Sequence, residues 1–175
     1  MIKKKNLLWM FAAILFCGVM TTSCGSDDDD SSNSGGDTNI VGMRIAYAVT
    51  LLDGYNTLED YTISVTWTDE NGKDVTENIT TDFVKDVMLK SSQSTKATFI
   101  VKCTPTYSKK AEHNIGVDIA FLAKPMNSKG EVTERGSQRE AKTYDKKALT
   151  TEGYKEYIFS RKFQLVNGQI NSISE

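Results

Sequence analysis

Residues 61–68 read Tyr61-Thr62-Ile63-Ser64-Val65-Thr66-Trp67-Thr68, and the pair Asn71-Gly72 follows three residues later. In the first stretch, large apolar side chains alternate with threonine and serine. This period of two is typical of a strand with one buried and one exposed face. Asn-Gly is a strong signal for a tight turn because both residues tolerate positive φ. The stretch therefore predicts a hairpin in which residues 73–79 return antiparallel, with Trp67 in the core.

The same alternation continues on both sides of this hairpin. Before it, residues 41–51 place five apolar side chains on one face: Met43, Ile45, Tyr47, Val49 and Leu51. After it, period-two segments are 95–103, 114–123 and 157–166, and Asn167-Gly168 predicts a last hairpin closing with 169–173. Residues 83–90 fit either a strand or one helical turn. Residues 131–144 are so charged that they fit either an exposed edge strand or a mobile loop.

These segments predict an all-β fold. About seven strands separated by turn signals, with no helical period of useful length, favour one antiparallel β-sandwich or a small barrel over residues 40–175. In size and strand count the domain is similar to an immunoglobulin-like sandwich, although it lacks the Cys-Trp-Cys core of true immunoglobulin domains.

The N-terminus has the pattern of a secretory signal. Three lysines, Lys3 to Lys5, precede the apolar run 7–20, which is too short to span a bilayer as a helix, and Thr21-Thr22-Ser23-Cys24 follows. This pattern resembles that of Bacteroidetes-type lipoproteins, whose cleavage motifs are often relaxed from the usual leucine, here replaced by Thr21. The resemblance implies that residues 1–23 are removed and that Cys24 is acylated. Cys17, preceded by the bulky Phe16, is the weaker candidate for this role.

An acidic run follows the cysteine directly. Asp27, Asp28, Asp29 and Asp30 begin a stretch of Gly, Ser, Asp, Asn and Thr that predicts a flexible tether over residues 24–39. Outer-membrane lipoproteins of this type that face the cell exterior often carry such a run, which implies that these residues are an export tag. Four adjacent aspartates lack the alternating ligands of a calcium loop, so we expect no metal there.

The charge of the domain argues against nucleic acid as a partner. Removing Lys3 to Lys5 leaves 18 of the 21 basic residues, and the tether holds five of the 23 acidic ones, which leaves 18 in the domain. A neutral domain lacks the basic surface that nucleic-acid binding requires. Residues 38–88 are acidic and residues 124–162 basic, so either the two halves pair across the fold or the second half presents a basic face to anionic glycans.

The residues that could perform catalysis are few. Once Cys24 is acylated, Cys103 has no cysteine to pair with, and its alternation with Ala97, Phe99 and Val101 predicts a small core residue. The sequence holds one histidine, His113, and no phosphate loop, nucleophile elbow or metalloprotease motif. Carboxylates that could act as a pair are Glu131, Glu134 and Glu140, in a segment that reads as solvated.

We therefore expect a non-catalytic protein without cofactors, attached to the outer membrane through its N-terminal lipid. Many lipoproteins of this resemblance assist glycan capture, which implies carbohydrate as a partner. Rings that could stack on sugars are Tyr107, Tyr144 and Tyr154, whose contexts read as loops, although each also fits a half-buried tyrosine. The alternative is a structural or assembly component, pilin-like or part of an envelope complex, which would need an unpaired groove or strand edge.

Overall fold

The computed structural model describes residues 39–106, 112–149 and 155–173, and most of them lie in strands. In chain order the elements are β1 (Ile40–Leu51), α2 (Thr57–Asp60), β2 (Tyr61–Thr68), β3 (Asp74–Ile79), β4 (Phe83–Lys90), β5 (Lys96–Pro105), β6 (Glu112–Asn127), β7 (Gln138–Leu149), β8 (Tyr157–Val166) and β9 (Gln169–Ile173). These described ranges hold nine strands rather than about seven, because both ambiguous segments contribute one, β4 and β7. Within the same ranges, no helix is long and apolar enough to cross a membrane.

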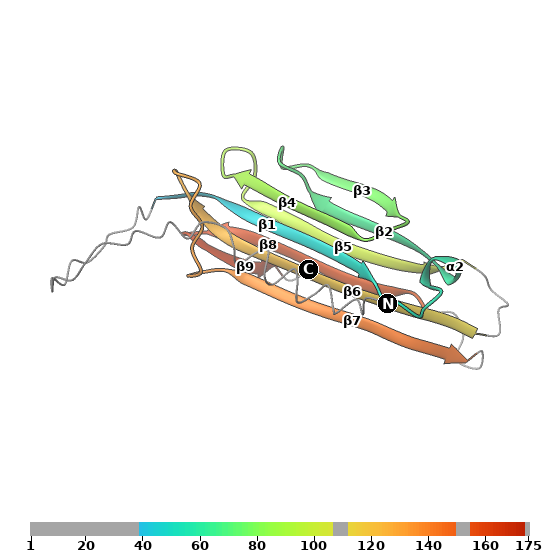
Figure 1. Ribbon diagram of the computed structural model, residues 1–175. Coiled ribbons are helices and arrows are strands. Elements are labelled where there is room, and N and C mark those ends of the chain that lie inside the picture. The colour runs from blue at the N-terminus through green and yellow to red at the C-terminus, as the bar shows by residue number, and fades with distance from the viewer. Residues whose placement is uncertain (1–38, 107–111, 150–154, 174–175) are drawn as a thin grey trace, which may run out of the picture. The chain divides into compact units, whose positions relative to one another are not determined.

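The strands form two antiparallel sheets that pack face to face (Figure 1). One sheet has the order β4-β1-β6-β7 and the other the order β3-β2-β5-β8-β9. The predicted all-β sandwich is confirmed, and the barrel alternative is not, because the two sheets remain separate. The likeness to an immunoglobulin domain is one of architecture and does not extend to strand order. Here β1 lies inside its sheet, whereas the first strand of an immunoglobulin constant domain lies at an edge.

One continuous apolar layer fills the space between the sheets. The Tyr47 ring of β1 contacts the Phe99 ring of β5 at 5.0 Å between centroids, and the Phe121 ring of β6 stacks on Phe163 of β8 at 5.2 Å. Trp67 is 6% exposed and lies 5.0 Å from the Phe83 ring, so its predicted core position is confirmed. Aromatic pairs at these separations add to the burial energy of the rings and fix how the two sheets sit.

The two Asn-Gly pairs both close hairpins, but through different turns. At the β8–β9 turn, Asn167 and Gly168 both have positive φ, 51° and 73°, as a two-residue turn requires. Between β2 and β3 the loop is longer, and of its residues Gly72 has positive φ, 76°, while Asn71 does not. The Asp69 carboxylate accepts hydrogen bonds from the backbone N–H groups of Asn71 and Lys73, both at 2.9 Å, which stabilises this wider loop.

The single turn of helix α2 was not predicted, and it packs against the backbone of β6. The Thr57 hydroxyl accepts a hydrogen bond from the Gly116 N–H at 2.9 Å and lies 3.3 Å from the Gly116 carbonyl oxygen. A side chain at position 116 would meet the Tyr55 ring at 2.4 Å, so this contact requires glycine. Four residues are too few to display a helical period, which is why the sequence pattern does not reveal them.

The position of Phe99 at the centre of the apolar layer predicts a large effect of its removal. We expect Phe99→Ala to lower the free energy of unfolding by about 3–5 kcal/mol, because it leaves a cavity that both sheets line. The control Ile158→Ala removes a side chain that is 54% exposed and should change stability by less than about 0.5 kcal/mol. Urea denaturation followed by tryptophan fluorescence measures both, and similar losses in the two variants would contradict this packing.

Candidate functional site

Several residues that the sequence singled out lie outside the described residues. These are Cys24, the run Asp27, Asp28, Asp29 and Asp30, and the rings of Tyr107 and Tyr154; the side chain of His113 is likewise not described. The lipid anchor, the export tag and two of the three candidate sugar platforms therefore stay predictions.

Cys103 is a buried core residue, as predicted. It is fully buried on β5, opposite Ile63 of β2 on one side and Tyr157 of β8 on the other. Desolvation raises the pKa of its thiol to about 12, because the low-polarity interior disfavours the thiolate. A thiol that is neutral and enclosed cannot act as a nucleophile at physiological pH.

The three candidate carboxylates each have a separate structural partner. Glu131 accepts a hydrogen bond from the Asn127 side-chain amide at 2.8 Å, and Glu134 forms an ion pair with Lys124. Glu140 forms an ion pair with Arg161 across the two sheets. None of these contacts joins two carboxylates, and the described residues contain no cluster of three or more His, Cys, Asp or Glu that could hold a metal ion.

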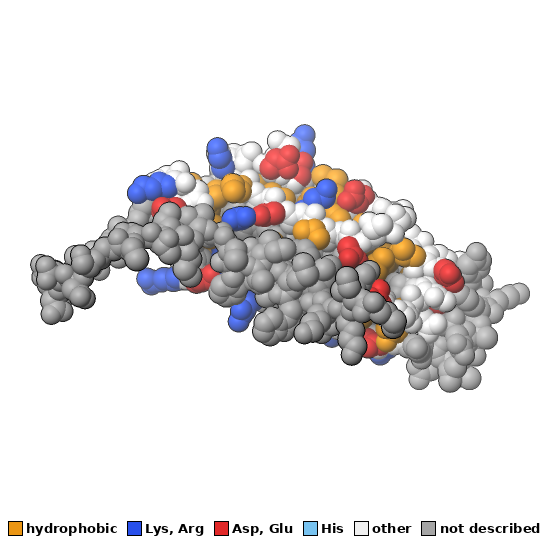
Figure 2. Space-filling view, in the orientation of Figure 1, with side chains coloured by type: hydrophobic (Ala, Val, Ile, Leu, Met, Phe, Trp, Pro, Cys, Tyr) orange, Lys and Arg blue, Asp and Glu red, His pale blue; other side chains and the backbone are white. Residues whose placement is uncertain are grey.

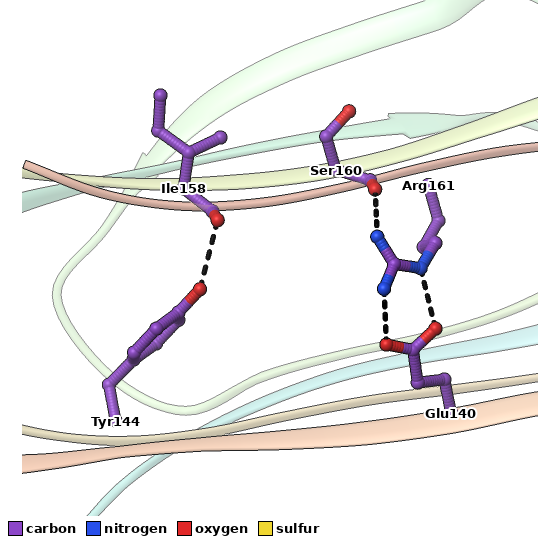
Figure 3. Close-up of polar contacts among 5 residues, drawn as sticks. All are labelled: Glu140, Tyr144, Ile158, Ser160 and Arg161. Atoms are coloured by element: carbon purple, nitrogen blue, oxygen red, sulfur yellow. Dashed lines mark hydrogen bonds and ion pairs between the residues drawn. The ribbon is translucent and has the colours of Figure 1, made fainter. Parts of the chain in front are cut away.

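The Glu140–Arg161 pair belongs to a group of polar contacts that closes one side of the sandwich, shown in Figure 3. Arg161 points from β8 toward β7, donates two hydrogen bonds to the Glu140 carboxylate at 2.5 Å and a third to the Ser160 carbonyl oxygen at 2.7 Å. The hydrogen bond to Glu140 raises the pKa of the guanidinium. The guanidinium also lies 5.0 Å from the centre of the Phe159 ring. Together with Tyr144 and Ile158, these residues form what we call the β7–β8 clasp.

Tyr144 is part of this clasp and is not a free sugar platform. It lies on strand β7 rather than in a loop, and its hydroxyl donates to the Ile158 carbonyl oxygen at 2.9 Å (Figure 3). Its ring is half-buried, 5.1 Å from the ring of Tyr157. The half-buried alternative for this residue is therefore confirmed. The sequence could not reveal it, because the partner atom is a backbone oxygen on the other sheet.

Three ion pairs of the described residues each join two residues of the same half of the chain. Arg44 pairs with Asp86 within the first half, and Lys124–Glu134 and Arg161–Glu140 both lie within the second. These three contacts do not cancel the polarity along the chain, and the pairing of the two halves stays a prediction. A basic face remains compatible with this arrangement.

A row of small and apolar side chains runs across the outer face of the four-stranded sheet. Register places Val84 of β4 opposite Ala48 of β1, Ala48 opposite Ala120 of β6, and Ala120 opposite Ala141 of β7. We call these four residues the outer row. Figure 2 shows hydrophobic side chains at the surface of the described part, interspersed with charged ones. Alternation alone placed Ala46 and Ala48 outward, but the row emerges only when all four strands are in register.

At the β4 end of the outer row the apolar side chains are exposed. Val84 is 47% exposed and Met88 is 53% exposed, and both lie on the outer face of β4 on either side of Asp86. Elsewhere in the described residues the large exposed apolar side chains are Leu58, Ile158 and Val166, and none of these is aromatic. Because Ala48 in the middle of the outer row is only 7% exposed, the candidate interaction surface is the exposed edge of β4 around Val84 and Met88.

Searches of protein-family models, curated proteins and solved structures return no match to this chain.

The buried thiol of Cys103 predicts slow chemical labelling. We expect the Cys103 thiol of the folded protein at pH 8 to react with a thiol reagent several-fold or more slowly than in denaturant, because its raised pKa keeps it neutral and the core excludes the reagent. The rate in increasing urea should follow global unfolding. Rapid labelling in the absence of denaturant would show that this side of the core opens locally.

The clasp predicts a measurable coupling between its charged members. In a double-mutant cycle with Glu140→Ala and Arg161→Ala, we expect a coupling of about 0.5–1 kcal/mol, limited by solvent screening because both side chains are partly exposed. The matched cycle at Lys102 and Glu156, a single contact at 2.9 Å on exposed side chains, should give less than about 0.5 kcal/mol. Added salt should reduce the first value. Equal coupling energies in the two cycles would mean that the Glu140–Arg161 pair is no stronger than an ordinary exposed ion pair.

Proposed function

We propose that the protein is a non-catalytic outer-membrane lipoprotein that presents one β-sandwich on the cell surface as a binding module. The observation that carries this proposal is the order of elements before the domain: apolar run, Ser23-Cys24, then Asp27 to Asp30. That order provides export, anchoring and surface display in sequence, and the domain that follows is a sandwich, a fold that commonly carries recognition surfaces.

The absence of catalysis is supported by how the reactive side chains are used. Cys103 lies in the core, and each of Glu131, Glu134 and Glu140 has its own structural partner. Catalytic groups instead converge on one reacting atom and are left available to it. These four side chains are thus committed to holding the fold.

Carbohydrate is the proposed ligand class, by way of glycan capture at the surface. The described residues weigh against a stacking site at Trp67 or Tyr144, which are buried and half-buried. If the module binds sugars, the stacking ring is then Tyr107 or Tyr154, or the contact is polar and uses the basic second half of the chain.

The alternative function, a structural or assembly component, has one specific observation in its favour. Strand β4 is an edge of its sheet and displays two exposed apolar side chains, Val84 and Met88. An unpaired strand edge is the feature that assembly by strand addition needs. We place this function second. A binding module and an assembly subunit share the same anchor, and they differ in what the edge of β4 contacts.

Proteinase treatment of intact cells tests the proposed location. We expect the wild-type protein to be digested and the variant in which Asp27, Asp28, Asp29 and Asp30 are replaced by alanine to be protected, because the acidic run directs export to the outer face. A periplasmic protein serves as the control for cell integrity. Protection of both proteins would place the domain in the periplasm and would exclude a surface-binding role.

Metabolic labelling with a fatty acid tests the anchor separately. Cys24→Ser should lose the lipid label and leave the membrane fraction, whereas Cys17→Ser should keep both, since residue 17 lies in the removed segment. Labelling of Cys24→Ser at the wild-type level would refute acylation at this position.

A further inference from the structure

The two sides of the sandwich are closed in different ways. On the side of β7, the β7–β8 clasp and a hydrogen bond from the Ile170 N–H to the Gly136 carbonyl oxygen, 2.9 Å, tie the two sheets together. On the opposite side, β4 and β3 are edge strands of different sheets and are not hydrogen-bonded to each other. There the ammonium of Lys85 lies 5.3 Å from the Trp67 ring and covers the end of the core. The open side is therefore the one that ends in β4.

Four residues of β4 have backbone polar groups that point away from its sheet. Ser91 donates to Val41 at 2.7 Å, and these two residues continue the β1–β4 register. Because hydrogen-bonded pairs alternate along an antiparallel ladder, the odd-numbered residues of β4 bond to β1 and the even-numbered ones face outward. The outward-facing N–H of Lys90 is bound by the Gln93 side chain at 3.0 Å, which ends the edge. Val84, Asp86 and Met88 keep outward-facing backbone groups within the described residues.

The side chains of these same residues are arranged symmetrically. Val84 and Met88 lie two positions on either side of Asp86 on the outer face, and both are about half exposed. Edge strands of soluble proteins are usually protected by charges, prolines, bulges or shortness. Strand β4 has eight residues, no proline, and no irregularity in its register with β1. Its inward-pointing charge, Lys85, leans over its own core rather than across the edge.

We propose that β4 pairs with β4 of a second copy of this chain, antiparallel, about a two-fold axis through Asp86. Asp86 then lies opposite the partner's Asp86, and Val84 lies opposite the partner's Met88. The apolar contact forms twice because the axis repeats it. In this pairing, the side chains of β4 that face the core lie on the same side of the extended sheet in both copies, and the outward-facing side chains lie on its other side.

The two adjacent registers match the side chains less well, and an axis at Met88 would pair Asp86 with Lys90, whose backbone N–H is already bound by the Gln93 side chain. Moving the axis to Lys85 places Val84 opposite the partner's Asp86, and moving it to Val87 places Asp86 opposite the partner's Met88. On the outer face, both shifts replace apolar contacts with contacts between charged and apolar groups; on the inner face, the proposed register places Lys85 opposite the partner's Val87. This self-complementarity is the reason to choose a second copy over an unrelated strand, whose side chains would have no reason to mirror β4.

The like charges at the axis are compensated within each copy. Arg44 donates to both oxygens of the Asp86 carboxylate, at 3.0 Å from Nε and 2.6 Å from Nη2. Two neutralised ion pairs, rather than two bare carboxylates, therefore meet at the axis. A single paired strand is a small interface compared with stable complexes, so we expect reversible association that is strengthened when both copies are held on one membrane.

Cysteine cross-linking in membranes that contain the full-length chain tests the register. Directly opposed residues have Cα atoms about 5.5 Å apart, within the range that a disulfide bridges. Asp86→Cys should therefore give a disulfide-linked dimer with itself on oxidation. Val84→Cys and Met88→Cys should each give several-fold less dimer when expressed singly, and should cross-link to each other when expressed together. The wild type gives the background from its own cysteines.

The outcomes separate cleanly. Adding Val84→Lys and Met88→Lys to the Asp86→Cys chain should abolish the dimer, while Cys103 stays resistant to labelling and so reports an intact fold. Equal dimer from all single cysteines, or no dimer above wild type, would overturn the proposal. A cross-link from Asp86→Cys to a chain of different mass would replace the second copy with another protein. The proposal goes beyond the proposed function, and membranes from lysed cells test it wherever the domain is displayed.

Discussion

The contact between the rings of Tyr47 and Phe99 holds the domain together at its centre. Strand β1 lies inside one sheet and β5 is the middle strand of the other. The contact therefore joins an interior strand of each sheet. The pairs Trp67–Phe83 and Phe121–Phe163 extend the same layer toward the two sides. Because the layer is largely apolar, polar groups at its two sides must find partners there or face water. The β7–β8 clasp does this on one side, and Lys85 covers the other.

Much of this fold could be predicted because apolar and polar residues alternate in a half-buried strand, so the sequence shows which face is buried. The alternation around Trp67 identified β2 and its buried face, and Asn167-Gly168 marked the last turn with both of its residues at positive φ. Strand β7 was harder. As an edge strand with one neighbour, it buries little, so its charged residues look like those of a loop.

The outer row could not be predicted from the sequence, for a different reason. The outer row exists because Val84, Ala48, Ala120 and Ala141 come from four strands far apart in the chain, and no local pattern reports which residues of distant strands are opposite. The partner of Tyr144 is a carbonyl oxygen on the other sheet, which has no side-chain identity to detect. By contrast, the predicted location signals before the domain are local patterns in the chain, so they can be proposed from the sequence alone.

The contact between Thr57 and Gly116 has a consequence for evolution. The Thr57 hydroxyl accepts a hydrogen bond from the Gly116 N–H, and the Tyr55 ring occupies the space where a side chain at 116 would lie. Any descendant of this fold that keeps α2 on β6 must therefore keep glycine at this place, even after its core residues have exchanged for others of similar size. A glycine in the strand that corresponds to β6, with a serine or threonine about sixty positions earlier, would therefore identify distant relatives even where the overall sequence identity is low.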